Sequence, residues 1–294
     1  MKKLVSILIV LFSGLCVYAQ SDAILTQQWL SRINCNPAAT GNTNDVNIFL
    51  MHRTQWSKFD KNTAPQTSLL NATNYFKSIN SGLGLSLAYD KEGEMNTNYN
   101  AKLAYAYHFN LSEASLLSLG LGLNLQNRNI NYLKMRMVFG DDPSIPSNID
   151  KENKTGIDFD FGFEFITDRF TLGASLNRIG KTSIEKLNSF KNGQQLYAYA
   201  RYRISVTEGL DLAPTASYVY ANHMDVWEAG LTGFIANQIW VGAAYRWDVA
   251  LAFYAGFEFN LFRVGYAYDH YIKDSNNLGG THEIMLSVKI PHKR

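Results

Sequence analysis

The sequence predicts an all-β fold, a transmembrane outer-membrane β-barrel of about 14 antiparallel strands with short periplasmic turns and long extracellular loops. Three observations predict it: apolar and polar residues alternate, the alternating runs are long enough to cross a bilayer, and short connections alternate with long ones. From Ile239 to Trp247 every second residue is apolar or aromatic, and similar runs follow as far as Ile290. A period of two is typical of strands whose two faces meet different environments.

A soluble β-sandwich or barrel that buries its apolar face inward is the alternative. Two runs weigh against it: residues 117–125 place Leu at every second position, and residues 157–165 place Ile or Phe there. A soluble core would have to bury such a face from about a dozen strands, whereas a transmembrane barrel turns it towards lipid. The transmembrane barrel is therefore favoured.

The first 19 residues predict a signal peptide. Lys2 and Lys3 form a basic start, residues 4–12 are apolar, and Ala19 offers a cleavage position, so that the mature chain would begin at Gln20. Cys16 raises a lipoprotein alternative, but it follows Leu15, where a lipidation signal has a small residue.

Residues 20–44 predict an irregular periplasmic or lumenal N-terminal segment, because they lack alternation and contain Pro37 and Gly41. Residues 45–294 predict the transmembrane barrel. Its expected strands are 46–55, 66–76, 82–90, 98–109, 115–128, 155–166, 170–178, 195–206, 210–220, 226–234, 239–247, 251–260, 262–270 and 282–290.

The connections support the membrane orientation. Short joins near 77–81, 110–114, 167–169, 207–209 and 236–238 alternate with longer polar stretches such as 57–65, 129–154, 179–194 and 271–281. Outer-membrane barrels have short periplasmic turns and long outer loops, and an even strand count returns both chain ends to the periplasm. The strand-end aromatic residues Trp56, Trp227, Trp247 and Tyr271 are expected in interfacial girdles.

Charge and cysteine content exclude several classes of protein and of site. The chain has 27 basic and 25 acidic residues, and loss of Lys2 and Lys3 with the leader leaves 25 of each. A neutral chain lacks the basic surface that nucleic acid requires, so we expect no nucleic-acid partner. Cys35 is the only cysteine beyond the leader, which excludes an internal disulfide and a thiolate metal cluster. We expect no cofactor and no metal.

Charged residues of both signs fall on the face expected to line the lumen. They could form a selective pore or pair into a hydrogen-bonded, partly plugged interior, and the second is favoured because neither sign predominates. These residues are Lys102, Asp158, Asp160, Glu164, Arg201, Arg203, Glu228, Arg246, Glu258, Arg263, Asp269, Glu283 and Lys289.

An enzyme is not predicted. The six histidines show no metal-ligand spacing, and neither a G-x-S-x-G nor an H-E-x-x-H motif occurs. His270 follows Asp269, and His282 precedes Glu283, so within a strand each pair would face opposite sides. An outer-membrane hydrolase with scattered site residues is a further alternative.

Several short motifs lie near the two ends of the expected barrel. Asn36-Pro37-Ala38-Ala39-Thr40-Gly41 precedes the first strand, Arg53-Thr54-Gln55-Trp56 ends it, and Pro65-Gln66-Thr67 begins the second. Gly265-Tyr266-Ala267-Tyr268-Asp269 and Gly280-Thr281-His282-Glu283-Ile284-Met285-Leu286 lie in the last two strands. Together they resemble the motifs of the PorP/SprF family, outer-membrane components of the type IX secretion system and of gliding machinery. Ala39 departs from the family pattern, which has Tyr there, and Pro291-His292-Lys293-Arg294 extends past the usual aromatic end.

The resemblance implies a location in the cell outer membrane and a non-enzymatic role in type IX protein secretion or gliding. It also implies three partners: outer-membrane lipid, a secreted surface protein or adhesin, and periplasmic type IX secretion components. The loop 129–154, with Asp141-Asp142-Pro143, is the expected docking surface. A general porin or small-solute channel is the alternative function. The motif residues expected to have structural or interaction roles are Asn36, Pro37, Gly41, Arg53, Gln55, Trp56, Gly265, Tyr266, Asp269, His282 and Glu283.

A purely structural interpretation also fits these motifs. Asn36 and Gly41 would form turns, Asn by capping backbone groups and Gly by adopting a positive φ. Arg53 and Glu283 would form a salt bridge in the lumen, where the first strand meets the last.

Overall fold

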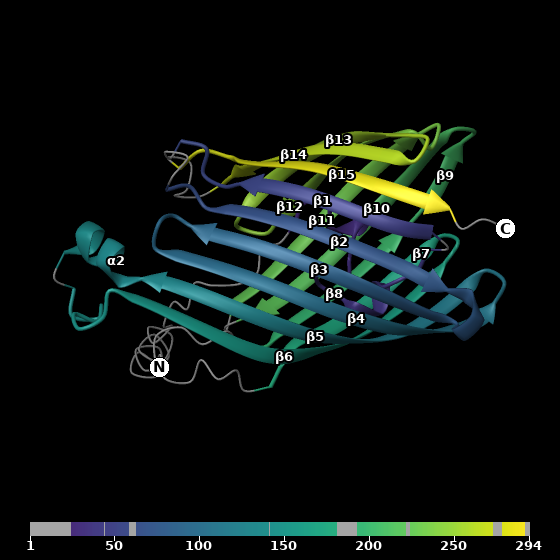
Figure 1. Ribbon diagram of the computed structural model, residues 1–294. Helices are drawn as coiled ribbons and strands as arrows, with labels where there is room; N and C mark the ends of the chain where they lie inside the picture. Colours follow the sequence, from purple (N-terminus) through teal and green to yellow (C-terminus); the bar gives the residue numbers. More distant parts are fainter. Residues whose placement is uncertain are drawn as a thin grey trace, which may run out of the picture.

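Antiparallel strands wrap around a central lumen in the computed structural model of the chain (Figure 1). The structure describes residues 25–43, 45–58, 63–140, 142–180, 193–221, 224–272 and 278–291. The predicted signal peptide, the first residues of the predicted N-terminal segment and Asp141 lie outside the described residues.

The strands follow the predicted alternating runs. They are β1 (Asp45–Thr54), β2 (Gln66–Phe76), β3 (Ser81–Glu92), β4 (Asn96–Ser112), β5 (Ser115–Asn131), β6 (Lys151–Thr167), β7 (Phe170–Ile179), β8 (Gln195–Tyr202), β9 (Ile204–Thr207), β10 (Leu210–Ala221), β11 (Met224–Ile235), β12 (Ile239–Arg246), β13 (Ala250–Phe259), β14 (Phe262–Tyr271) and β15 (Thr281–Pro291). The helices are η1 (Gln28–Leu30), η2 (Pro37–Ala39), η3 (Lys77–Ile79) and α2 (Tyr132–Phe139).

Hydrogen bonds close the sheet into a barrel. Apart from β8 and β9, consecutive strands pair with each other, and β1 also pairs with β15, with Arg53 opposite Glu283. β8 and β9 both pair with β10 and lie end to end, so they occupy one strand position of the wall, which is interrupted at Arg203. The 15 hydrogen-bonded segments therefore form a closed antiparallel barrel with 14 strand positions, which confirms the predicted fold.

Side chains alternate between a lipid-facing exterior and a packed interior. In β5 the leucines from Leu119 to Leu125 are exposed, whereas the intervening Gly120, Gly122 and Asn124 point inward and are buried. This confirms that the apolar face points outward. One girdle residue was wrongly predicted: Trp227 and Trp247 are exposed, but Tyr271 points inward and its hydroxyl lies 2.9 Å from Thr281 Oγ1.

The predicted loop 129–154 is shorter than expected, because β5 and β6 continue past the other strands. Asn127 Nδ2 donates to Asn153 Oδ1 at 2.7 Å and to Thr155 Oγ1 at 2.9 Å, so polar cross-strand pairs extend the hairpin. Helix α2 forms at its tip, where the Asn131 side chain accepts from the Lys134 backbone N–H at 3.1 Å. Figure 1 shows α2 beyond the ends of the neighbouring strands. No helix in the described part of the chain is long and apolar enough to cross a membrane.

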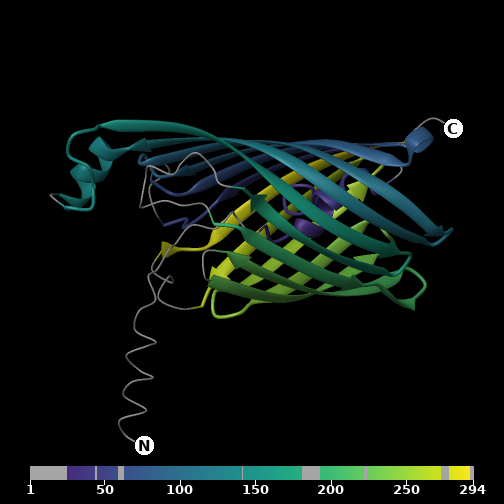
Figure 2. The same cartoon turned by 90° about the horizontal axis from the view of Figure 1, so that it is seen from below.

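The N-terminal residues 25–43, here called the plug, lie inside the barrel (Figure 2). Their apolar side chains join the largest buried cluster, in which Leu25 and Leu30 pack with Phe49, Met51 and Trp240 from the walls. Burial of one such leucine contributes about 1.5–3 kcal/mol. The core of the protein therefore lies between the plug and the inner wall.

Candidate functional site

The predicted motif residue Asn36 anchors the centre of the plug. Its side-chain oxygen accepts from the Ala38 backbone N–H at 3.0 Å and so caps η2, with Pro37 in the first turn. Its Nδ2 donates to the Phe163 carbonyl and to the Tyr199 hydroxyl, each at 3.0 Å. Asn36 is fully buried, so it joins the plug to β6 and β8.

Glycines in the wall make room for the plug. A Cβ on Gly120 would lie 2.2 Å from the backbone nitrogen of Ala38, and one on Gly82 would lie 2.0 Å from the carbonyl oxygen of Thr40. The predicted motif residue Gly41 has φ +66°, which favours glycine. The backbone of the plug therefore approaches the wall more closely than any side chain at these wall positions would permit.

Motif residues from the two ends of the chain meet in a buried ion network. Arg53 Nη1 lies 3.4 Å from Glu283 Oε1, and Arg53 Nη2 lies 3.5 Å from Asp269 Oδ2. Arg246 Nη1 lies 3.3 Å from the same Asp269 oxygen. All four side chains are almost fully buried, so their opposite charges pair where β1, β14 and β15 meet, and Arg246 also pairs with Glu228 at 2.7 Å.

The same carboxylates hold the start of the plug. The Thr26 backbone N–H donates to both oxygens of Glu283, at 3.2 and 3.1 Å, and the Thr26 hydroxyl donates to Asp269 Oδ1 at 2.6 Å. Three separated motifs thus converge on one place where the plug joins the wall.

The remaining motif residues lie outside this network. Gln55 continues β1 beyond its end, with its backbone N–H donating to the Pro65 carbonyl at 2.9 Å, and Trp56 follows with φ 57°. Gly265 lies against Met285, because a Cβ on it would be 2.1 Å from the Met285 Cε. Tyr266 and His282 face the exterior of the barrel, and the Tyr266 hydroxyl lies 2.6 Å from His282 Nδ1.

A second attachment of the plug depends on Glu164, which the sequence placed in the lumen without a partner. Glu164 is fully buried and accepts from Arg32 Nε at 2.6 Å, from Asn42 Nδ2 at 2.6 Å and from the Tyr199 hydroxyl. Burial alone would lower the pKa of the Arg32 guanidinium, but the charge of Glu164 raises it above its ordinary value. Arg32 therefore remains charged.

The other unpredicted contacts are made by the backbone of the plug. Lys102 Nζ donates to the Asn34 carbonyl at 2.6 Å and forms an ion pair with Asp160 at 2.7 Å. Ser175 Oγ and Asn177 Nδ2 donate to the Cys35 carbonyl, at 2.5 and 2.9 Å. The alternation marked Lys102 and Asp160 as inward-facing, but no sequence signal connects them with a segment about 60 residues or more away.

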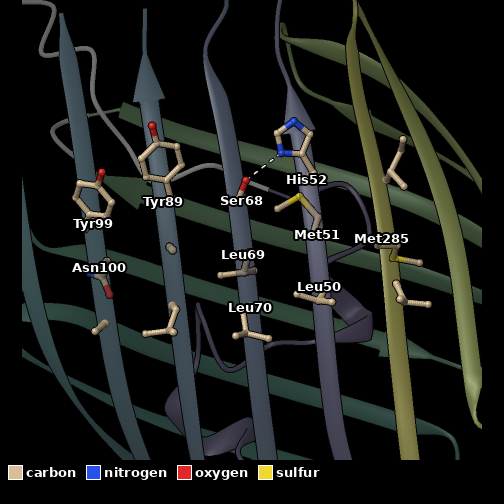
Figure 3. Close-up of a pocket in the computed structure, with 15 residues that line it drawn as sticks. Leu50, Met51, His52, Ser68, Leu69, Leu70, Tyr89, Tyr99, Asn100 and Met285 are labelled. Atoms are coloured by element: carbon tan, nitrogen blue, oxygen red, sulfur yellow. Dashed lines mark hydrogen bonds between the residues drawn. The ribbon is translucent and has the colours of Figure 1, made fainter. Parts of the chain in front are cut away.

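The exterior carries an apolar groove of about 670 Å³ over β1 to β4 and β15 (Figure 3). Leu50, Leu70 and Leu286 are among its lining residues. Figure 3 shows one polar contact at the groove, between His52 Nδ1 and Ser68 Oγ at 2.9 Å. This face is lipid-facing wall, with polar residues confined to one side.

Metal chemistry finds no support in the described ranges, where no group of three or more His, Cys, Asp or Glu side chains is arranged to hold a metal ion. His270 is exposed beside the buried Asp269, and His282 faces away from Glu283. Neither pair is thus arranged for acid–base catalysis across one site.

Solved structures resemble this fold at low sequence identity. The Ralstonia pickettii toluene transporter TbuX has a TM-score of 0.54 and 10% identity, over 88% of this chain and 92% of that one. The monoaromatic hydrocarbon channel CymD has a TM-score of 0.54 and 10% identity, over 91% and 94%. The Pseudomonas putida toluene transporter TodX has a TM-score of 0.53 and 10% identity, over 92% and 95%. At this identity the likeness concerns the fold.

A family profile gives a more specific result. No curated protein sequence matches the chain. The profile of the type IX secretion system membrane protein PorP/SprF matches residues 17–288, which is nearly the whole chain. With the closed barrel and the lipid-facing exterior, this match places the protein in the outer membrane. The chain belongs to the PorP/SprF family of type IX secretion system membrane proteins.

Proposed function

We propose that this outer-membrane component of type IX secretion receives or anchors a secreted surface protein at its long-loop end. We further propose that it contacts periplasmic secretion components at its short-turn end, and that it acts without catalysis. The observation that carries the proposal is the exposed apolar tip of the β5–β6 hairpin. We call this hairpin, residues 127–140 and 142–155, the finger.

The finger exposes apolar side chains where lipid does not cover them. Met137, Val138 and Phe139 are 71%, 61% and 61% exposed at the end of α2. Exposed leucines on the barrel wall face membrane hydrocarbon, but α2 lies beyond the ends of the other strands (Figure 1). Clustered apolar side chains in water are typical of protein-binding surfaces.

The finger is held in a defined shape by hydrogen bonds. Arg136 Nη1 donates to the carbonyls of Pro146 and Ile149, at 2.5 and 2.9 Å, so the loop after α2 folds back onto the helix. The Tyr132 hydroxyl donates to Glu152 Oε2 at 2.8 Å, and burial together with this bond raises the pKa of Tyr132. An ordered tip loses little conformational freedom on binding, which favours affinity.

The alternative function, a general porin or small-solute channel, needs a continuous aqueous path. The plug opposes such a path, because it is bonded to Glu164 on one side and to Asp269 and Glu283 on the other. In planar bilayers we expect the purified protein to show low conductance. Sizeable, stable single-channel conductance would instead favour the porin function.

A retention assay tests the binding role of the finger. The double variant Val138→Ser, Phe139→Ser removes the apolar tip, and we expect surface retention of the secreted protein to fall about tenfold because apolar anchor residues dominate binding energies. The secreted protein is quantified on intact cells and in the medium. Val206→Ser, at an exposed apolar position near a short turn, is the matched control. Unchanged retention in the double variant, with normal barrel levels, contradicts the proposal.

A further inference from the structure

A cavity of about 570 Å³ lies at the short-turn end of the lumen. Its lining includes Trp29 and Arg32 of the plug, the 167–169 turn between β6 and β7, and Arg201 near the end of β8. We call this cavity the vestibule. Its volume falls within the roughly 300–1,000 Å³ of ligand pockets in general.

The vestibule carries an excess of positive charge. Six cationic side chains line it: Arg32, Arg169, Arg201, Arg203, Arg263 and Lys289. Four carboxylates oppose them. Asp168 and Glu258 belong to the lining, whereas Glu164 and Asp211 lie outside it and pair with Arg32 and Arg203. Six cations against four carboxylates leave two positive charges in excess. A concave surface of one sign concentrates ligands of the opposite sign.

In the described residues, neither Arg169 nor Arg201 has a carboxylate within ion-pair distance, and of the two Arg169 is exposed whereas Arg201 is half-buried. The Arg201 guanidinium carbon lies 4.3 Å from the centre of the Trp29 ring and 5.1 Å from that of Phe234. The nearby charges of Arg32, Arg203 and Arg263 repel it. An arginine stacked on aromatic rings keeps its N–H edge for a planar acceptor, and a carboxylate matches that edge with two parallel hydrogen bonds.

The aromatic lining narrows the class of ligand. Trp29, Phe234 and Trp240 lie among the cations, so the vestibule suits a segment that carries apolar side chains beside its carboxylates. The chain's own C-terminal residues are poor candidates, because Lys293 and Arg294 are basic. Short turns lie on the periplasmic side of outer-membrane barrels, so a ligand from a periplasmic protein would reach the vestibule.

We propose that the vestibule binds an acidic peptide segment of a periplasmic protein, and that Arg201 receives one of its carboxylates. The inference rests on the proposed function only for the source of the ligand, a periplasmic secretion component. The site itself is defined by the plug and the wall.

Fluorescence anisotropy with the purified full chain in detergent tests this binding. The probe is a labelled short peptide of alternating Asp and Phe, compared with its Asn–Phe counterpart. We expect the acidic peptide to bind at least about tenfold more tightly, because a hydrogen bond to a charged group contributes about 1.5–3 kcal/mol. Arg201→Gln should raise its Kd by about the same factor. Equal binding of the two peptides overturns the proposal.

Matched variants and a competitor sharpen the result. Arg201→Lys keeps the charge but loses the planar edge, so we expect an intermediate Kd. Lys77→Gln, at an exposed position in η3 of the same end, removes one positive charge outside the vestibule and should bind as the unaltered protein does. Complete displacement of the peptide by equimolar inorganic phosphate would reveal a general anion site and overturn the proposal.

The finger variant separates this inference from the proposed function. Val138→Ser, Phe139→Ser should bind the acidic peptide normally, because the finger and the vestibule lie at opposite ends of the barrel. Absent peptide binding together with finger-dependent retention would overturn the vestibule proposal alone. Normal peptide binding with unchanged retention would overturn the finger proposal alone.

Discussion

Gly162 leaves the space that the amide side chain of Asn36 occupies. A Cβ on Gly162 would lie 2.1 Å from Asn36 Oδ1 and 3.2 Å from the Pro37 Cδ. Asn36 is fully buried, so its amide has no solvent-filled space into which it could move. The pair explains how a polar turn is placed against the wall of a barrel without an opening between them.

Gly162→Ala should loosen the plug while leaving the barrel closed. The added methyl group overpacks the Asn36 site at a cost of about 1–3 kcal/mol, and the plug can move more easily than the paired strands. We expect Cys35 in the plug to react with a thiol reagent about fivefold faster or more in native detergent solution. The alkylation rate, followed by mass spectrometry, measures this change.

Gly233→Ala is the control for that experiment. A Cβ at Gly233 would have its nearest neighbour at 3.7 Å, an ordinary van der Waals contact. An equal acceleration in both variants, or none in Gly162→Ala, would contradict the close fit between plug and wall.

Glu164→Gln should release the middle of the plug. Gln keeps the shape of the side chain but leaves the charge of Arg32 unpaired, at a cost of about 3 kcal/mol for a buried pair. Amide hydrogen exchange in residues 25–43 should then be about a hundredfold faster. Asp225→Asn removes an exposed carboxylate far from the plug, and its exchange should match that of the unaltered protein. Unchanged protection in Glu164→Gln would show that Arg32 and Glu164 do not hold the plug.

The Cys35 thiol should remain protonated at ordinary pH. Burial raises its pKa from 9.0 to about 12, because the surrounding plug and wall desolvate the half-buried thiolate. Since the thiolate is the reactive form, alkylation at pH 8 should be at least about tenfold slower than in the unfolded chain. Between pH 9 and pH 12 the unfolded chain loses this proton and the folded chain keeps it, so stability should fall as pH rises through that window.

Rates measured from pH 7 to pH 11 in detergent and in denaturant test this assignment. If the native thiol titrates near pH 9 with full reactivity, the surroundings of Cys35 are more open than the structure indicates.

The strands were predictable because the membrane constrains which residue types can face outward along each strand of the wall. Lipid favours apolar residues at most outward positions, so the 14 strand positions of the barrel appear in the sequence as alternation. The contact between Arg53 and Glu283 was also foreseeable, since the first and last strands must pair to close a barrel. These features follow from local pattern and topology.

The contacts between the plug and the wall were not predictable in the same way. Asn36 fits against Gly162 and Ala38 against Gly120, but these partners are separated by more than 80 residues, and no periodicity relates them. The finger was missed for another reason. Its polar residues, such as Asn129 and Asn153, were interpreted as loop, although the two residues pair across β5 and β6 and continue the sheet there.

Arg53→Met should destabilise the barrel where β1, β14 and β15 meet. Asp269 and Glu283 would then share Arg246 with Glu228, which already lies 2.7 Å from Arg246 Nη2, and an unbalanced buried charge costs about 3–5 kcal/mol. The double variant Arg53→Met, Glu283→Gln should recover more than half of that loss, because it removes one charge of each sign and keeps an acceptor for the Thr26 N–H. The free energy of unfolding, from denaturant titration in lipid vesicles, measures both, with Lys77→Met as the exposed control. A double variant no more stable than Arg53→Met alone would mean that Arg53 acts through packing, with the charge balance of the network playing no part.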